Sequence, residues 1–362
     1  MRLSICHVIT TINLGGAERQ LLELASSQKR NGSRVEVIFL KDQPVLKQAF
    51  ADNGVIVNDD FSKLNFIGQL ISFRKKMRST TQVVHAHLPR AELLCALTLR
   101  KKRFVVTRHN SEPFFPNGSK YVSRILSRLV LTRAFHSVFI SKAVEIYTRE
   151  SGELPKQART SVIYYGIRDN FVNQVHKINN KDTSLRIATI ARLVPQKNIP
   201  LLLDTVKIIS QFGISFHLTI VGIGTLSEEL QAISLKLGLQ DRITWLGQID
   251  KVETVYADMD IFVLTSNYEG FGLVLLEAMS FGVPVVARRI SAIPEVLGDS
   301  HPGLVDTGYG QDFARTIMDI GQNRKFRDGC LKIQSEQLSK FSIETSEMSH
   351  YKLYVRLQQN ER

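Results

Sequence analysis

Two glutamates and a pair of glycines stand close together in the second half of this 362-residue chain. They lie in the segment DIFVLTSNYEGFGLVLLEAMSFGVPVVA (260–287), where a strand should lead into a loop and then a helix. Gly270 and Gly272 would let a phosphate approach the helix N-terminus, whose N–H groups and positive dipole end bind anions. Glu269 and Glu277 could accept hydrogen bonds from sugar hydroxyls. The segment therefore indicates a site for a phosphorylated sugar.

Both glutamates also have a purely structural interpretation. Glu269 could complement the helix dipole, and Glu277 could be a solvated helix residue. Glu277 stands among the apolar residues LVLLEAM, however, where an unpaired charge would be costly to bury. This surrounding favours the functional interpretation.

Two cations precede another predicted helix. In IATIARLVPQKNIPLLLDTV (187–206) a strand should end at Arg192, and Lys197 stands just before an amphipathic helix. An arginine fork and a lysine point charge at such a turn could clamp a pyrophosphate, although a pair of surface cations is the alternative. The turn VGIG, with Gly222, follows the next strand, and by itself it is weak evidence for a nucleotide site.

These residues need a scaffold that brings strand ends together. Short β-branched runs alternate with amphipathic stretches in both halves of the chain, which indicates two parallel sheets. The predicted strands are 3–9, 34–40, 82–87, 103–108 and 136–140, then 186–192, 216–222, 242–246, 260–265 and 284–288. We predict an α/β protein with two Rossmann-like doubly wound domains facing a central cleft, with chemistry in the loops after the strands.

The domain boundaries follow from a change in composition. Residues 171–184 turn polar and lose periodicity, which predicts a linker. We expect an N-terminal acceptor-binding domain over 1–170 and a C-terminal donor-binding domain over 185–341. Apolar positions at helical spacing predict a closing helix over 342–362, which could pack back on the first domain.

Taken together, these motifs resemble the family 4 retaining glycosyltransferases, also known as glycosyl transferases group 1, which have the GT-B fold. The resemblance rests on Arg192 with Lys197, on the VGIG turn and on EGFGLVLLEAM. It spans nearly the whole chain, because GGAE (15–18) resembles the family's glycine loop and His109 in VVTRHN its active-site histidine.

The resemblance implies a role for each of these residues. Arg192 and Lys197 would neutralise the diphosphate leaving group, Glu277 would bind the ribose hydroxyls, and Glu269 would hold the transferred sugar. Gly16 would offer its backbone near the phosphates, and His109 would line the sugar pocket. The implied catalytic residues are His109 and Glu269, and the implied donor-binding residues are Gly16, Arg192, Lys197, Gly222, Gly270, Phe271, Gly272 and Glu277.

The family's usual mechanism implies that neither a side-chain general base nor a metal ion is needed. Same-face attack, with the donor phosphate taking the acceptor's proton, requires no side-chain general base. The two cations and the helix dipole would replace a divalent ion, so we expect no metal and no cofactor beyond the nucleotide sugar. His85 and His87 share one face of a predicted strand but have no Asp or Cys at ligand spacing, so a metal there is disfavoured. His87 is a substrate contact or a core histidine.

Two positions depart from the family pattern. Ile223 stands where an acid is common, and Tyr165 stands where Asn usually precedes the glycine. We expect both residues to lie away from the phosphate and sugar contacts, so that they affect mainly the choice of nucleotide base. The favoured donor is a UDP-sugar, and a GDP-sugar is the alternative.

Positive charge is concentrated in the N-terminal half. Residues 1–178 hold 28 Lys and Arg against 13 Asp and Glu, and a one-sided basic field attracts phosphates or anionic lipid. The segment KYVSRILSRLVLTR (120–133) predicts a basic amphipathic helix that could lie on a membrane, with a solvated helix as the alternative. Phe114 and Phe115 nearby could meet a lipid tail or cap the core. Nucleic acid is disfavoured because no binding signature accompanies the charge.

The cysteines and the length of the apolar runs indicate where in the cell the protein acts. Three isolated cysteines indicate a reducing compartment, and no apolar run is long enough to span a bilayer. We therefore predict a cytoplasmic glycosyltransferase, peripheral to the membrane, that transfers a hexose or N-acetylhexosamine to a lipid-linked or other membrane-associated glycan in cell-surface polysaccharide synthesis. The alternatives are a nucleotide-sugar epimerase and a non-catalytic nucleotide-sugar- or glycan-binding scaffold.

Overall fold

The computed structural model describes residues 2–78, 82–116, 118–168 and 184–359. The chain divides into two compact units, Met1–Arg168 with Phe341–Arg362, and Asp169–Lys340. All but the last residue of the predicted linker 171–184 falls outside the described residues. The cleft between the two domains stays a prediction.

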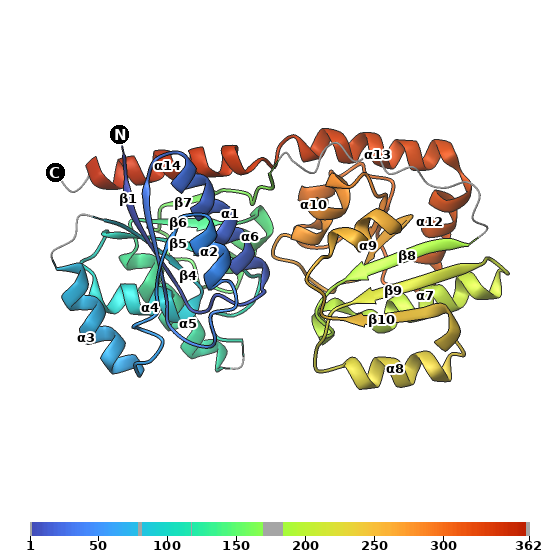
Figure 1. The fold of residues 1–362 in the computed structure, drawn as a ribbon, viewed down its shortest axis with the longest axis horizontal. Coiled ribbons are helices and arrows are strands. Elements are labelled where there is room, and N and C mark those ends of the chain that lie inside the picture. The colour runs from blue at the N-terminus through green and yellow to red at the C-terminus, as the bar shows by residue number, and fades with distance from the viewer. Residues whose placement is uncertain (1, 79–81, 117, 169–183, 360–362) are drawn as a thin grey trace. The chain divides into compact units, whose positions relative to one another are not determined.

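The first unit contains a seven-stranded parallel sheet in the order β3-β2-β1-β4-β5-β6-β7 (Figure 1). Its strands are β1 (Ser4–Ile9), β2 (Arg34–Phe39), β3 (Ile56–Asn58), β4 (Val83–His87), β5 (Phe104–Arg108), β6 (His136–Phe139) and β7 (Thr160–Val162). Its helices are α1 (Gly16–Arg30), α2 (Lys47–Asp52), α3 (Phe66–Met77), α4 (Pro89–Thr98), α5 (Lys120–Arg133), α6 (Lys142–Glu150) and α14 (Ile343–Gln359). The central strands β1, β4 and β5 are almost wholly buried, as expected of a parallel sheet covered by helices on both faces.

The closing helix α14 belongs to this first unit. It buries Leu353, Tyr354 and Leu357 in a core that also contains Leu3 and Val105 of the sheet region. The helix lies beside α1 (Figure 1). Helical spacing of apolar residues thus gives α14 one buried face, and that face packs on the N-terminal unit.

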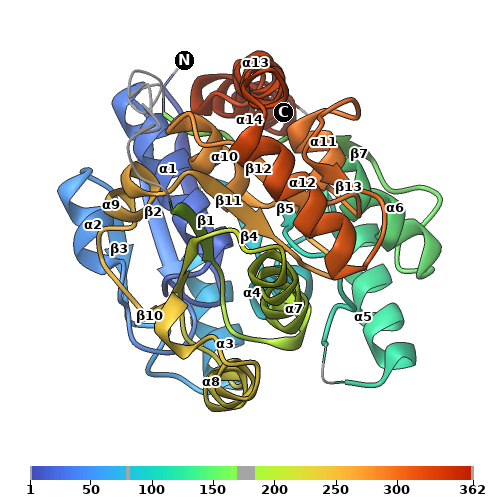
Figure 2. The same ribbon diagram turned by 90° about the vertical axis from the view of Figure 1, so that its right-hand side faces the viewer.

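The second unit contains a six-stranded parallel sheet in the order β10-β9-β8-β11-β12-β13. Its strands are β8 (Leu185–Ile190), β9 (Phe216–Val221), β10 (Ile243–Gly247), β11 (Ile261–Leu264), β12 (Val285–Arg288) and β13 (Leu304–Val305). Its helices are α7 (Ile199–Gln211), α8 (Ser227–Lys236), α9 (Glu253–Asp258), α10 (Leu273–Ser280), α11 (Ile293–Leu297), α12 (Gly310–Gln322) and α13 (Arg324–Leu338). Helices α7 and α12 pack against each other over this sheet (Figure 2).

Both sheets reverse their strand order at one place, which confirms the predicted doubly wound α/β fold. The reversal lies between β1 and β4 in the first unit and between β8 and β11 in the second. Ligands of such sheets bind beyond the carboxyl ends of the strands at this switch point. The loops after β8 and β11, which carry Lys197 and Glu269, therefore occupy the expected binding position of the second unit.

Candidate functional site

Lys197 and Glu269 meet at the switch point of the second unit. The Lys197 ammonium donates to Glu269 Oε1 at 2.5 Å, and both side chains are mostly buried, with 13% and 7% of their surface exposed. Ser266 Oγ donates to the same oxygen at 2.6 Å. Lys197 lies at the end of a 3₁₀ turn (Pro195–Lys197), and Thr265 Oγ1 holds that turn by donating to the Lys197 carbonyl at 3.1 Å. A cation and a carboxylate are thus fixed side by side where a ligand should bind.

Arg192 lies in the same loop but remains exposed. Strand β8 ends at Ile190, so the expectation that it continues to Arg192 was two residues too long. The guanidinium contacts Gln196 Oε1 at 3.4 Å, and Gln196 in turn donates to the Tyr268 carbonyl at 3.0 Å. The loops after β8 and β11 are therefore linked through Gln196, while the arginine keeps donors toward solvent.

The glycine turn after β9 packs closely against the backbone of the Arg192 loop. A Cβ on Gly222 would lie 1.9 Å from the Ala191 carbonyl oxygen, and one on Gly224 would lie 2.2 Å from the Leu193 carbonyl oxygen. Gly222 also has φ +131°, a conformation that side chains rarely adopt. The VGIG motif is therefore needed because the Arg192 loop crosses directly over it, and Leu193 N–H donates to the Ile223 carbonyl.

Helix α10 begins just after the loop that carries Glu269. Gly272 caps the helix with φ +91° and no side-chain hydrogen bond, and Phe271 before it is buried. Gly270 is partly buried. Glu277, one turn into the helix, is partly buried and accepts from the Tyr256 hydroxyl at 2.8 Å. Its carboxylate is therefore held in place by the protein, which removes the cost of an unpaired charge among apolar neighbours.

His109 lies just after β5 in the first unit, and both of its ring nitrogens already have protein partners. Nε2 contacts His87 Nδ1 at 3.1 Å, and Nδ1 contacts the Tyr165 hydroxyl. The expectation that Tyr165 lies away from the site residues is therefore wrong. Tyr165 and His109 are 56 residues apart in sequence, so no local pattern joins them.

Gly16 begins α1 and is exposed. A Cβ on the preceding Gly15 would lie 2.2 Å from Glu18 Oε2, so the glycine makes room for that carboxylate. Thr11 Oγ1 donates to Glu18 Oε1 at 2.7 Å. The glycine loop therefore folds around its own glutamate at the N-terminus of α1.

A cluster of histidines fills the core beside His109. His7, His85 and His87 offer ligand atoms within 4.8 Å of one another, a spacing that could suit a metal ion. Each of their six ring nitrogens, however, contacts a protein group. His7 contacts His87 and Gln28, His85 contacts Tyr354 and Thr107, and His87 contacts His7 and His109, all between 2.7 and 3.1 Å. The cluster is thus a complete hydrogen-bond network, and the sequence patterns did not show which groups His7 contacts.

Burial keeps these histidines neutral. Desolvation lowers the pKa of His7 to about 4 and that of His109 to about 3, and it holds those of His85 and His87 well below their usual value. His350 of α14 behaves likewise, with a pKa of about 4, and its Nδ1 donates to the Ser346 carbonyl at 2.8 Å. His350, His109 and Tyr165 line a cavity of about 20 Å³, room for one water molecule.

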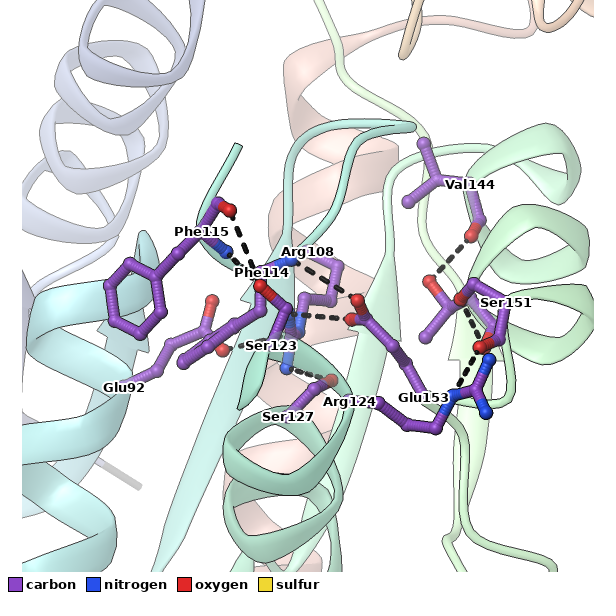
Figure 3. A network of polar contacts seen from close by, with 11 residues as sticks. Glu92, Arg108, Phe114, Phe115, Ser123, Arg124, Ser127, Val144, Ser151 and Glu153 are labelled. Carbon is purple, nitrogen blue, oxygen red and sulfur yellow. Dashed lines mark hydrogen bonds and ion pairs between the residues drawn. The ribbon is translucent and has the colours of Figure 1, made fainter. Parts of the chain in front are cut away.

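Arg108, next to His109, holds together the loop that follows β5 (Figure 3). Its Nε lies 3.1 Å from Glu92, its Nη1 lies 3.9 Å from Glu153, and its Nη2 donates to Ser127 at 2.9 Å. Glu153 also accepts from the Phe114 backbone N–H at 3.1 Å. Burial raises the pKa of Glu92 to about 7, although Arg108 opposes the shift.

The same cluster settles the role of Phe114. Its side chain is fully buried, and its ring centroid lies 4.5 Å from the Arg108 guanidinium carbon (Figure 3). The prediction that Phe114 could meet a lipid tail is therefore wrong, and its alternative, a core residue, is correct. Phe115 is partly buried against it.

Helix α5 coincides with the predicted basic amphipathic segment and carries an exposed apolar stripe. Tyr121, Val122, Ile125 and Leu129 are exposed, beside the exposed cations Lys120, Arg124 and Arg128. Its other face is buried through Ser123, Ser127, Val130 and Leu131. Among the residues that the structure describes, none of the helices is both long and apolar enough to traverse a bilayer.

Comparison with known proteins covers both halves of the chain. A family model described as Glycosyltransferase Family 4 matches residues 14–171, and one described as Glycosyl transferases group 1 matches residues 171–335. A phosphatidyl-myo-inositol mannosyltransferase of Propionibacterium freudenreichii is 26% identical over 328 residues, covering 84% of this chain and 81% of the relative. The gpi3 subunit of the phosphatidylinositol N-acetylglucosaminyltransferase of Schizosaccharomyces pombe is 31% identical over 253 residues, covering 67% of this chain and 54% of the relative.

The solved structures agree on the fold. HepE of Anabaena, in complex with UDP and glucose, superposes with a TM-score of 0.84 at 21% identity, covering 98% of this chain and all of that one. Its likeness extends over both units, and the two family models meet at residue 171, near the boundary between them. The chain therefore belongs to the family 4 glycosyltransferases of the GT-B fold.

Proposed function

We propose that this glycosyltransferase transfers a hexose or N-acetylhexosamine from a nucleotide-diphosphate sugar to a lipid-linked or other membrane-associated acceptor, with retention of configuration. The observation that carries the proposal is the Lys197–Glu269 pair at the switch point of the second unit, beside Arg192 and the N-terminus of α10. Two cations and a helix N-terminus suit the diphosphate, and a carboxylate suits the hydroxyls of the sugar.

The donor would be bound by groups on the loops after β8 and β11 and on helix α10. Lys197 has further N–H donors beyond the one given to Glu269, and the exposed Arg192 guanidinium can approach the same phosphates. Oε1 of Glu269 already accepts hydrogen bonds from Lys197 and Ser266. A sugar hydroxyl would therefore donate its hydrogen bond to Oε2. Glu277, oriented by Tyr256, would accept from the ribose. A UDP-sugar is favoured, supported by the UDP bound in the structurally similar HepE.

In the proposed reaction the bond between the anomeric carbon and the diphosphate oxygen breaks, and the acceptor oxygen bonds to that carbon on the same face. The acceptor's hydroxyl proton passes to the departing diphosphate, so no side-chain base is needed. Glu269 is already ion-paired, which makes it a binding group rather than a base. Arg192, Lys197 and the α10 N-terminus stabilise the leaving diphosphate, and we propose that no divalent metal is required.

The acceptor side is assigned to the basic first unit. The exposed apolar stripe of α5, with its flanking cations, suits the headgroup region of an anionic membrane. Two relatives are named for transfer to phosphatidylinositol lipids, which supports an acceptor held at a membrane. The cytoplasmic face is the proposed place of action.

The test is hydrolysis of UDP-glucose, followed by ¹H NMR of the released sugar before its anomers equilibrate. A retaining enzyme should release α-glucose first. Lys197→Ala and Glu277→Ala should each lower the rate at least about 100-fold, because both act on the donor itself. Lys236→Ala, an exposed lysine on α8, is the matched control and should keep the wild-type rate.

Two outcomes would contradict the proposal. Full turnover in the Lys197 and Glu277 variants would place the donor elsewhere. An isomerised nucleotide sugar without release of UDP would indicate an epimerase.

A further inference from the structure

A single file of hydrogen bonds runs from α1 to the segment that follows β7. Gln28 Oε1 lies 2.8 Å from His7 Nε2, His7 Nδ1 lies 3.0 Å from His87 Nε2, and His87 Nδ1 lies 3.1 Å from His109 Nε2. The Tyr165 hydroxyl contacts His109 Nδ1 and ends the file. We call these five side chains, Gln28, His7, His87, His109 and Tyr165, the histidine relay.

With Oε1 of Gln28 facing His7, the relay has one consistent proton arrangement. An amide oxygen only accepts, so His7 must donate from Nε2 and, as a neutral ring, accept at Nδ1. His87 must then donate from Nε2 to His7 and accept at Nδ1, and His109 must do the same. This leaves Tyr165 as the donor to His109 Nδ1. The tautomer of each ring is set by the partner of its other nitrogen.

The surroundings enforce this arrangement. All five side chains are less than a tenth exposed, so water does not compete for the ring nitrogens. A protonated ring would turn an accepting nitrogen into a donor and break the file, and burial keeps the pKa of all three histidines below neutrality. Burial also raises the pKa of Tyr165 well above its usual value, so its hydroxyl keeps the proton that it donates.

We infer that His87 and Tyr165 are positioning residues that fix His109 in one orientation and in the Nε2–H tautomer. The inference rests on the proposed function in so far as the His109 ring, whose two nitrogens are held by His87 and Tyr165, lines the sugar pocket. The tautomer itself can be observed without any turnover. The residues that hold the histidine are Tyr165 and His87, and both contacts are made by side chains of the first unit.

The direct test is ¹⁵N NMR of the full chain labelled at histidine, in which protonated and unprotonated ring nitrogens resonate far apart. Wild-type His109 should be the Nε2–H tautomer. Tyr165→Phe removes the donor to Nδ1 and should give mixed tautomers, with kcat on UDP-glucose lowered about tenfold or more and the donor KM little changed, because a displaced group costs rate rather than affinity.

The matched control is Thr107→Val. Thr107 is also buried and its hydroxyl contacts a histidine at 2.7 Å, but that histidine is His85, which lies outside the relay. The control should show a similar loss of thermal stability while leaving the His109 tautomer and kcat as in the wild type. A purely structural role for Tyr165 would make the two variants behave alike.

A second pair of variants tests His87. Asn at this position can still present an oxygen to His109 Nε2, so His87→Asn should preserve the His109 tautomer, whereas His87→Leu should lose it. The inference is overturned if His109 keeps one tautomer in both Tyr165→Phe and His87→Leu, or if wild-type His109 carries its proton on Nδ1. If the wild type turns over no nucleotide sugar, the proposed function fails while the tautomer result still stands.

Discussion

At the scale of single residues, the first unit buries two carboxyl groups, and one arginine contacts both. Arg108 lies between Glu92 and Glu153, and burial raises the pKa of Glu92 to about 7. A group whose pKa is higher in the folded than in the unfolded chain stabilises the fold below its unfolded pKa, and that stability is lost as pH rises through the folded value. For Glu92 this window runs from about 4.5 to about 7.

Glu92→Gln should therefore change how stability depends on pH. Relative to the variant, the wild type should lose of the order of 3 kcal/mol of unfolding free energy between pH 4.5 and pH 7, because one pKa unit corresponds to about 1.4 kcal/mol. Urea unfolding of both proteins across this range measures the difference, with the exposed Glu150→Gln as control. A constant difference between wild type and Glu92→Gln would contradict an abnormal pKa.

Residue types led to the proposed donor groups but did not show their protein partners. Lys197, Glu269 and Glu277 drew notice because cations, carboxylates and glycines followed predicted strands, and their role in donor binding stays a prediction. The contact of Tyr165 with His109 was not recognisable, since it joins residues 56 apart and depends on how the chain after β7 returns to the end of β5. The partners of His7 were not recognisable for the same reason, because they come from other elements of the fold.

At the scale of elements, the long strands were predicted within two residues and the short ones were missed. β3, β7 and β13 have three, three and two residues and lie at the sheet edges, where a short run carries too little hydrophobic pattern. The VGIG turn was recognised, but its reason, the close crossing of the Arg192 loop, needed the structure.

Helix α5 gives the prediction at this scale. Ile125→Glu with Leu129→Glu should weaken binding to vesicles of anionic phospholipid by roughly tenfold or more, since each removes an apolar side chain that would enter the headgroup region. Co-sedimentation measures the binding. Leu235→Glu, an exposed leucine on α8 of the second unit, is the matched control. Equal binding of the double variant and the wild type would exclude α5 as the membrane surface.

At the scale of the whole molecule, we expect the two units to respond differently to acid. Six histidines of the first unit have a lowered pKa, against His301 in the described part of the second. A histidine with a lowered folded pKa contributes stability that is present above its unfolded value of about 6.5 and is lost as pH falls toward the folded value. For His7 and His350 that value is about 4.

The first unit should therefore open first when the pH falls from 6.5 to 4. Hydrogen exchange of peptides from β1 and β4, corrected for the intrinsic effect of pH, reports on that unit. Fluorescence of Trp245, the chain's single tryptophan, reports on the second. Protection of β1 and β4 should be lost before Trp245 responds. Simultaneous transitions, or an earlier change at Trp245, would show that the histidine network does not control acid stability.

The central claim is that Lys197 and the groups around it bind the diphosphate of a nucleotide sugar. The most direct measurement is thermal unfolding of the wild type and of Lys197→Ala with UDP-, GDP-, ADP- and TDP-sugars. A matching donor at 100 times its dissociation constant should stabilise the wild type by about 2.7 kcal/mol, and the same concentration should stabilise the variant far less. Equal stabilisation of both proteins, or none by any donor, would contradict the claim.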